Sequence, residues 1–369
     1  MNYKALLALS FVPRVGNQRL RALLNHFDDP GDAFKASPAE LKRIPTIDTR
    51  TANEISGYDP DSNGTVLTTM LQRLERLGGK IISINDPDYP ASLKQIYDPP
   101  AFLYILGALA ETDHDSVAIV GTRVPTEYGK SVTDELSREL VQAGLTIVSG
   151  MARGIDTVAH SSALQAGGRT IAVIGSGIDI IYPQDNIRLS RQIKEQGAIL
   201  SEYHIGTKPD AVNFPKRNRI ISGMTLGTVI IESSETGGAM ITASYALDQN
   251  REVFAIPGPI HEKQSRGTNK LIQQGRAKLV VSPDDIVEEI VSKLKYTQTN
   301  GTGSQSTPPA FEFNMFEQNI FDVLSKQPLH IDVIAQQSGL STSDTLVHLL
   351  SLEFKGAVKQ LAGKMFCKR

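Results

Sequence analysis

The sequence predicts an α/β protein: a Rossmann-like, doubly wound and mostly parallel sheet, with a small helical domain before it and a winged helix after it. Two patterns in the middle of the chain carry this prediction. Short continuous apolar runs, such as residues 117–120, 171–174 and 229–231, are typical of parallel strands buried on both faces. Amphipathic stretches such as residues 130–143 and 187–196 alternate with these runs, as expected of a doubly wound sheet.

Residues 1–64 are predicted to form the small helical domain. Two short segments, residues 12–16 (VPRVG) and 44–48 (IPTID), each lie between stretches of helical pattern, which predicts a helix, a tight hairpin and another helix in each case. This layout resembles tandem helix-hairpin-helix units, whose hairpins offer backbone N–H groups to a DNA phosphate. Arg14, Thr46 and Asp48 stand where small hairpin glycines are expected. A packing or partner role is therefore favoured over phosphate binding here.

Residues 65–295 are predicted to form the central domain, which carries the sheet. The strands expected there are residues 80–84, 102–107, 116–121, 145–149, 170–175, 198–202, 227–232, 252–256 and 278–281. With 369 residues, the chain is long enough for two or three domains.

The end of the chain is predicted to be a separate unit. Residues 296–309 contain no aliphatic side chain, which predicts a flexible linker over residues 296–311. Residues 312–369 then follow the pattern of a winged helix-turn-helix. The elements expected in it are helices at residues 317–325, 331–337 and 342–354, and strands at residues 358–361 and 364–367.

The composition limits the classes of function. The chain has 38 Lys and Arg against 40 Asp and Glu, so nucleic-acid binding requires a local basic patch. The single cysteine, Cys367, leaves no internal disulfide framework and no thiolate metal site. No apolar run approaches the roughly 18 residues that a membrane span needs. No membrane span is therefore expected, and the cytoplasm is the expected location.

One local basic patch stands out. Lys216, Arg217, Asn218 and Arg219 follow Phe214 within a few positions and precede an apolar run. Arg side chains bind phosphate oxygens with two parallel donors, and Lys adds a mobile charge. The cluster therefore predicts a site for a phosphate backbone. The alternative is a solvated surface turn, because runs of charge are common on surfaces.

Glycine-bearing turns end several of the expected strands. Gly121-Thr122-Arg123 ends one strand, and Ser149-Gly150 ends the next, followed by Arg153. In a doubly wound sheet the carboxyl ends of the strands meet at one edge, where ligands bind. The cations expected to converge there, as an anion groove, are Arg123, Arg153, Lys216, Arg217 and Arg219.

The residues do not favour a cofactor, a metal or a catalytic group. Gly175 and Gly177 lack the third glycine of a dinucleotide-binding turn, and no P-loop is present. Asp156 and His160 lie four apart on one helix, but no third ligand completes a metal site, so a buried hydrogen-bonded pair is favoured. Ser149 is expected to be a turn residue.

A series of motifs runs in order through the central domain. These are GTR at 121–123, SG at 149–150, RGID at 153–156, AH at 159–160, YP at 182–183, SEY at 201–203, FP at 214–215, RNRII at 217–221, REVFAIPG at 251–258 and GTN at 267–269. In this series the region from about 117 to 281 resembles the DNA-processing protein A family, also called Smf. The outer blocks resemble that family's sterile-alpha-motif-like domain and winged helix.

The resemblance implies a cytoplasmic, non-enzymatic protein that binds single-stranded DNA without strong sequence preference during natural transformation. It also implies that the protein helps to load the RecA recombinase onto the strand and is a homodimer. Lys216 joins the expected DNA-binding residues on charge alone. Carried over residue by residue, the others are Gly121, Thr122, Arg123, Ser149, Gly150, Arg153, Arg217, Asn218 and Arg219.

Two other functions compete with this interpretation. A Rossmann-like nucleotide hydrolase of the phosphoribohydrolase type also has a glycine turn after a late strand, which residues 236–239 partly imitate. A duplex-reading transcription regulator is disfavoured, because the expected recognition helix at residues 342–354 has no Lys or Arg. We expect Phe214 to be buried and DNA affinity to come mainly from phosphate contacts. Leu279 belongs either to a dimer or recombinase surface or to a packed strand.

Overall fold

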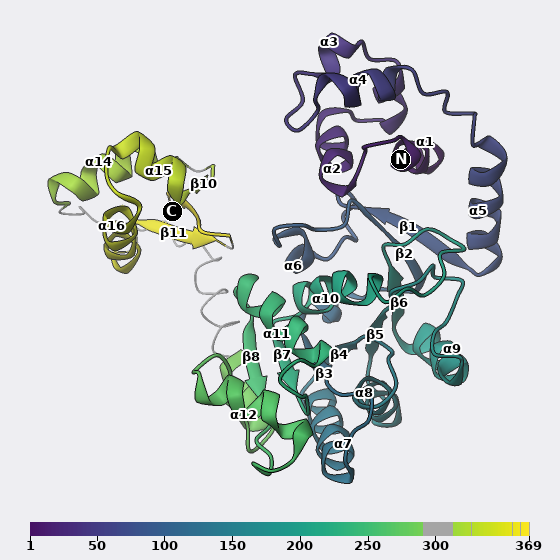
Figure 1. The fold of residues 1–369 in the computed structure, drawn as a ribbon, viewed down its shortest axis with the longest axis vertical. Coiled ribbons are helices and arrows are strands. Elements are labelled where there is room, and N and C mark those ends of the chain that lie inside the picture. Colours follow the sequence, from purple (N-terminus) through teal and green to yellow (C-terminus); the bar gives the residue numbers. More distant parts are fainter. Residues whose placement is uncertain (291–312, 326, 356, 362, 369) are drawn as a thin grey trace. The chain divides into compact units, whose positions relative to one another are not determined.

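The computed structural model describes residues 1–290, 313–325, 327–355, 357–361 and 363–368. The chain divides into two compact units (Figure 1). The first comprises Met1–Leu247 and Arg251–Ile290, and the second contains the C-terminal domain. The predicted linker at residues 296–311 lies outside the described residues, as do the boundaries proposed at its two ends.

A nine-stranded sheet forms the centre of the first unit, in the order β1-β2-β6-β5-β4-β3-β7-β8-β9. The strands are β1 Gly79–Ser83, β2 Phe102–Gly107, β3 Ser116–Val120, β4 Thr146–Ser149, β5 Thr170–Val173, β6 Ala198–Ser201, β7 Gly227–Ile230, β8 Glu252–Ala255 and β9 Lys278–Leu279. From β6 to β9 in this order all neighbours are parallel, whereas β1, β2 and β6 pair antiparallel. The predicted fold class, a mostly parallel doubly wound sheet, is confirmed.

The order of the strands places one crevice in this sheet. From β3 the chain moves through β4 and β5 to β6 on one side, and then returns to continue through β7 and β8 to β9 on the other. The carboxyl ends of β3 and β7 are therefore neighbours from which the chain leaves in opposite directions. Such a switch point is where a parallel sheet opens a crevice for ligands.

Helices cover both faces of the sheet (Figure 1). The helices α7 (Glu127–Gln142), α8 (Ile155–Gln165) and α9 (Ile187–Gln196) pack side by side, each connecting two successive strands. The helix α10 (Asn213–Met224) instead packs on β3, β4 and β5 and on the short helix α6 (Ala91–Lys94). Two further helices, α11 (Gly238–Asp248) and α12 (Arg266–Gln273), follow β7 and β8.

The N-terminal helices belong to the same compact unit as the sheet. They are α1 Tyr3–Phe11, α2 Asn17–His26, η1 Pro30–Phe34, α3 Pro38–Leu41, α4 Thr49–Ser56 and α5 Gly64–Arg76. Arg14 and Thr46, at the two predicted hairpins, have φ values of 67° and 75°. His204, beyond β6, stacks on Phe11 of α1 with ring centroids 4.8 Å apart. The buried core therefore continues from these helices into the sheet.

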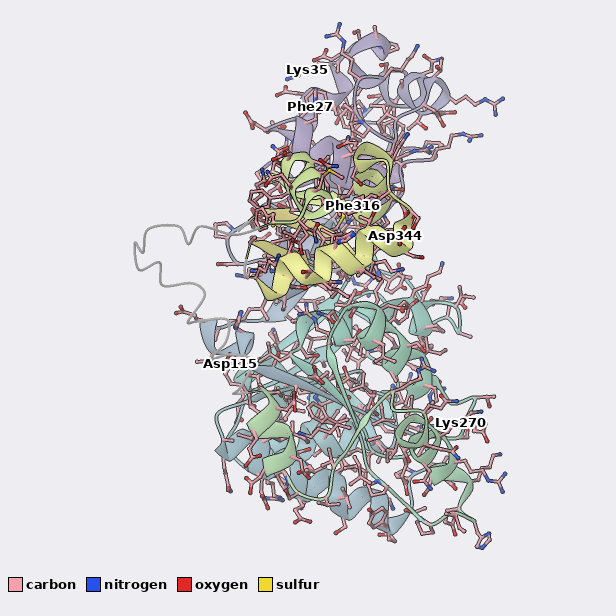
Figure 2. All side chains as sticks on the ribbon, turned by 90° about the vertical axis from the view of Figure 1, so that its left-hand side faces the viewer. Phe27, Lys35, Asp115, Lys270, Phe316 and Asp344 are labelled. Carbon is pink, nitrogen blue, oxygen red and sulfur yellow. The ribbon has the colours of Figure 1, made fainter. Side chains whose placement is uncertain are left out.

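The C-terminal unit is a winged helix, as predicted. It contains α14 Met315–Val323, β10 Leu329–His330, α15 Ile331–Ser338, α16 Thr342–Phe354, β11 Val358–Leu361 and β12 Met365–Lys368, with its strands in the order β10-β12-β11. The short strand β10 is an addition to the prediction. In α16, Asp344 lies in the first turn (Figure 2). The sequence of this helix contains no Lys or Arg. Cys367 is buried in β12 with a free thiol.

Among the described residues, none of the helices combines the length and the apolar character that crossing a bilayer requires.

Candidate nucleic-acid interface

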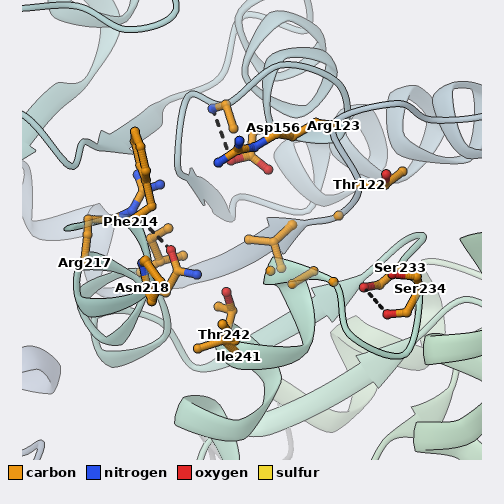
Figure 3. A pocket seen from close by; sticks show the side chains of 18 of the residues that line it. Thr122, Arg123, Asp156, Phe214, Arg217, Asn218, Ser233, Ser234, Ile241 and Thr242 are labelled. Atoms are coloured by element: carbon orange, nitrogen blue, oxygen red, sulfur yellow. Dashed lines mark hydrogen bonds between the residues drawn. The ribbon is translucent and has the colours of Figure 1, made fainter. Parts of the chain in front are cut away.

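An open groove of about 760 Å³ lies at the switch point of the sheet (Figure 3). Its walls come from the turn after β3, from α10, and from the segment that joins β7 to α11. Figure 3 shows Phe214, Arg217 and Asn218 on the α10 side and Ser233 and Ser234 on the β7 side. The predicted site residues that line this groove are Gly121, Thr122, Arg123, Arg217 and Asn218.

The turn after β3 is held close to the rest of the sheet. A Cβ atom on Gly121 would lie 2.5 Å from Cγ1 of Ile155, so only glycine lets α8 approach this closely. The backbone N–H of Thr122 donates to the carbonyl oxygen of Glu232 at 2.8 Å, and the carbonyl of Thr122 accepts from the N–H of Ile155. These contacts fix the backbone from which the Arg123 side chain extends.

Arg123 and two aromatic rings form one wall of the groove. The guanidinium carbon of Arg123 lies 5.5 Å from the centroid of the Phe214 ring, within the range of a cation–π interaction. The ring of Tyr182 lies 5.9 Å from that of Phe214, and 46% of Tyr182 is exposed. Phe214 is only half-buried and lines the groove, so the expectation that it is buried is wrong.

Arg217 reaches the groove but is a buried residue, with 4% exposure. Its Nη1 donates to the carbonyl oxygens of Gly150, at 2.8 Å, and of Val173. Its Nε donates to Oδ1 of Asn218. Burial lowers the pKa of Arg217 to about 10, and the charge of Asp156 opposes that shift. Arg217 thus remains charged at neutral pH and ties the ends of β4 and β5 together.

Arg219 points away from the groove. Its Nη1 and Nη2 donate to the two carboxylate oxygens of Glu202, both at 2.6 Å, and its Nε donates to the carbonyl oxygen of Asp98 at 3.0 Å. Burial alone would lower the pKa of Arg219, but the hydrogen bonds and charge of Glu202 raise it. The expected convergence of five cations on one rim is therefore wrong for Arg219.

Arg153 and Lys216 lie on the surface beside the groove. Arg153 pairs with Asp185, with Nη2 and Oδ2 2.9 Å apart, and both side chains are about two-thirds exposed. An exposed pair of this kind contributes little to stability, about 0–1 kcal/mol, so Arg153 can exchange Asp185 for another anion. Lys216 is exposed and makes no ion pair within the described part of the chain.

Ser149 and Gly150 support the site from beneath. The hydroxyl of Ser149 donates to the carbonyl oxygen of Ile119 at 2.6 Å in the sheet interior. A Cβ atom on Gly150 would lie 2.7 Å from both Nη2 of Arg217 and Oδ2 of Asp156. Both residues are buried and neither lines the groove.

Asp156 and His160 are both buried, as predicted, but they bond to different partners. Asp156 accepts from the backbone N–H groups of Gly150 and Ala152 at 3.1 and 3.3 Å. Burial raises the pKa of Asp156, and Arg217 opposes that rise. Burial lowers the pKa of His160 to about 3. The described residues contain no group of three His, Cys, Asp or Glu side chains placed to hold a metal ion.

The sequence predicts only part of the wall of the groove that lies opposite α10, after β7. Ser233, Ser234, Gly237 and Gly238 line the groove, and the glycine turn after β7 was a signal for them. Lys263, in the short helix η4 (Lys263–Ser265), also lines it, with no motif to mark it.

Asn218, on the α10 side of the groove, is one of the predicted site residues. Its carboxamide nitrogen donates no hydrogen bond among the described residues. That nitrogen is therefore available to a ligand.

The chain matches two family models. One, described as DNA recombination-mediator protein A, matches residues 80–291. The other, described as DprA winged helix domain, matches residues 305–364.

Related sequences and structures agree with these matches. The chain is 35% identical to Protein Smf of Synechocystis sp. over 98% of both chains, and 40% identical to DNA processing protein DprA of Bacillus subtilis over 72% of this chain and 91% of that one. Its fold resembles the X-ray structure of DNA processing protein A from Streptococcus pneumoniae, with a TM-score of 0.66 and 35% identity over 78% of this chain and 96% of that one. DNA processing protein A from Helicobacter pylori, whose structure gives insights into its unique single-stranded DNA binding mode, has a TM-score of 0.53 and 31% identity over 58% of this chain and 96% of that one.

Proposed function

Because the chain belongs to the DNA recombination-mediator protein A family, we propose that it binds single-stranded DNA in the groove at the switch point. It holds the strand without strong sequence preference and without changing it chemically. The observation that carries this proposal is the wall formed by Arg123, Phe214 and Tyr182. A single strand bound regardless of sequence needs cations for its backbone and flat rings for its bases, and this wall offers both.

The other polar groups of the groove suit a backbone rather than one base. Asn218 offers a free carboxamide nitrogen, and Lys263 adds a charge on the opposite wall. Asp156, the carboxylate in the lining, is engaged with two backbone N–H groups and faces Arg217. Cations therefore predominate among the charged groups that the groove presents to a ligand.

The rival function, hydrolysis of a mononucleotide, needs a carboxylate that is free to act on the substrate. The buried carboxylate beyond β7, Glu232, instead accepts hydrogen bonds from the backbone N–H of Thr126 at 2.9 Å and from its hydroxyl at 2.5 Å. Glu232 thereby caps the N-terminus of α7, where a negative charge is stabilising. Incubation with nucleoside monophosphates distinguishes the two functions, since released base would support the rival.

As finer parts of this proposal, the protein acts in the cytoplasm in natural transformation, as a homodimer that helps to load the RecA recombinase onto the bound strand. The family supports these roles. The edge strand β9 supports the dimer, because Leu279 and the nearby Val281 are 42% and 78% exposed. Among the described strands β9 pairs only with β8, so its outer edge is open to a partner strand.

The direct test is the substitution Arg123→Glu in the full chain. Arg123 is exposed and has no ion-pair partner in the described part of the chain, so the fold should be retained. Binding of a labelled oligothymidine should weaken by about tenfold or more, since a lost cation–phosphate contact and a new repulsion combine. Arg76→Glu, at an exposed position of α5, is the matched control and should bind as the wild type does. Equal affinity of Arg123→Glu and the control would contradict the proposal.

A further inference from the structure

We propose that a second groove, on the opposite side of α10, continues the path of the single strand onto the N-terminal helices. This inference rests on the proposed function. It extends that function to the first hairpin, for which the sequence favours a packing or partner role, and to Tyr97, which no sequence motif marks. The groove has a volume of about 550 Å³ and lies between the first hairpin, the start of α2 and the loop after α6. Its lining includes Arg14, Gln18, Arg19, Arg21 and Tyr97.

The charge of this second groove is positive. Arg14 is exposed, and its side chain makes no ion pair among the described residues. Arg21 and Arg219 both approach one carboxylate, that of Asp98, at 3.2 and 3.4 Å. The Nε of Arg21 is buried and has no hydrogen-bond partner in the described part of the chain. Arg219 is also paired with Glu202, so Asp98 is left mainly to Arg21. The lining of the groove holds three Arg side chains, those of Arg14, Arg19 and Arg21, against the one carboxylate of Asp98.

Arg19 plays a different part, because it holds the groove in shape. Its Nε donates to the carbonyl oxygen of Thr46 at 2.9 Å, and its Nη1 donates to that of Arg14 at 2.8 Å. Its Nη2 pairs with Asp48 at 3.0 Å. Arg19 therefore joins the two hairpins and fixes the backbone of Arg14. The Arg14 side chain is left for a ligand.

Tyr97 provides the aromatic surface. It is 92% exposed, the highest value among the large exposed apolar and aromatic side chains of the described residues. Its neighbour in sequence, Asp98, accepts a hydrogen bond from Asn17 of α2 at 2.6 Å, which holds the loop against the helix. A ring exposed to this degree beside a row of cations is the arrangement on which bases of a single strand stack.

α10 connects the two grooves. Arg217 and Asn218 line the first groove, whereas Arg219 faces Asp98 in the second. Lys216 is exposed on the same turn, and its carbonyl oxygen accepts from Nη1 of Arg219. A helix is about 10 Å across, which about three nucleotides span at a rise of about 3.4 Å each. A strand leaving the first groove can therefore cross α10 beside Lys216 and reach Tyr97.

The test compares a short oligothymidine with a long one, on the full chain. An oligomer of about 6 nucleotides fills the first groove alone, and one of about 20 reaches both, given the site sizes of single-strand-binding proteins. The double variant Arg14→Glu with Tyr97→Ala should weaken binding of the long oligomer by about tenfold, because stacking and phosphate contacts are both lost. Binding of the short oligomer should be unchanged.

Two controls make the result specific. Tyr97→Phe keeps the ring and should bind the long oligomer as the wild type does. Arg43→Glu, at an exposed position of the same helical region outside the second groove, should also have no effect. In addition, a long oligomer carrying photoreactive 5-iododeoxyuridine should cross-link to the peptide that contains Tyr97, and a short one should not.

The outcomes separate this inference from the function on which it rests. Wild-type affinity of the double variant for the long oligomer would overturn the second groove, while Arg123→Glu would still report on the first. An equal loss of affinity for both lengths would also overturn it, because the two grooves would then not be separate sites. If the wild-type chain bound neither oligomer, the proposed function itself would fall.

Discussion

Arg217 and Arg219 are two positions apart in the sequence, yet their side chains do different work. An α-helix turns by about 100° per residue, so positions two apart lie on nearly opposite sides. Arg217 consequently reaches the ends of β4 and β5, and Arg219 reaches Glu202 and Asp98. Both guanidinium groups are hydrogen-bonded within the protein, so neither is a free cation for phosphate. The exposed charges available to DNA near the first groove include those of Arg123, Lys216 and Lys263, and that of Arg153 if it releases Asp185.

The first residue-scale prediction concerns Arg217→Ala. Removal of this guanidinium leaves the Gly150 carbonyl without that donor and Asp156 without its facing charge. A buried acceptor left without its hydrogen bond costs about 1–3 kcal/mol. The melting temperature should therefore drop markedly, whereas Arg123→Ala should leave it near that of the wild type and impair only DNA binding. Thermal unfolding and DNA binding, measured on both variants, check these different roles of Arg217 and Arg123. A stable Arg217→Ala chain would refute the structural role of Arg217.

The second residue-scale prediction concerns acid. Burial lowers the pKa of His160 from 6.5 to about 3, so between these values the unfolded chain binds a proton that the folded chain does not. The stability contributed by neutral His160 is present above about pH 6.5 and is lost as the pH falls toward the folded value. The expected slope is at most about 1.4 kcal/mol per pH unit.

Denaturant unfolding between pH 6.5 and 5 measures this slope. His160→Gln should reduce the slope without abolishing it, because burial also lowers the pKa of His204, to about 4. The double variant His160→Gln with His204→Gln should flatten it, and His261→Gln, at an exposed histidine, should leave it as in the wild type. A slope that is unchanged in His160→Gln would show that His160 does not contribute to it.

At the scale of elements, the turn between β4 and α8 leaves little room for a larger residue. Gly150 is enclosed by Arg217 and Asp156, both of which would lie 2.7 Å from an added Cβ atom. Gly150→Ala should therefore cost about 1–3 kcal/mol, the usual range for overpacking. Gly238, at the start of α11, has nothing within 4 Å of an added Cβ atom, so Gly238→Ala is the stability control. Equal unfolding midpoints for the two variants would show that the turn can relax.

The elements were predictable because their patterns are local. Parallel strands buried on both faces, such as β3, β5 and β7, give continuous apolar runs. All nine strands of the large sheet were predicted, including the antiparallel β1 and β2. The strand β10 was not, because the two residues Leu329–His330 are too short for any pattern. For the site, the glycine turns and the segment at 214–218 were foreseen. The direction in which each cationic side chain points was not predicted. For those of α10 it depends on the rotation of the helix over the sheet and on Glu202 and Asp98, which come from other segments.

At the scale of the whole molecule, the open edge of β9 provides a prediction about assembly. Leu279 is 42% exposed and Val281 78%, so charged residues there should not disturb the core. If the proposed homodimer pairs through this edge, Leu279→Glu with Val281→Glu should leave a monomer, because two apolar edges can no longer pair. Light scattering measures the mass. Val66→Glu, at a half-exposed apolar position on α5, is the control, and an unchanged dimer in the edge variant would rule out this interface.

Cys367 allows opening of the C-terminal unit to be measured by thiol labelling. It is the only thiol in the chain, and it lies 9% exposed in β12 beside the core formed by Phe366 and Leu352. A thiol-reactive dye can therefore label the native sequence at a single known place, and only when the wing opens. The rate of labelling gives the free energy of that opening separately from the stability of the large unit, with no substitution introduced.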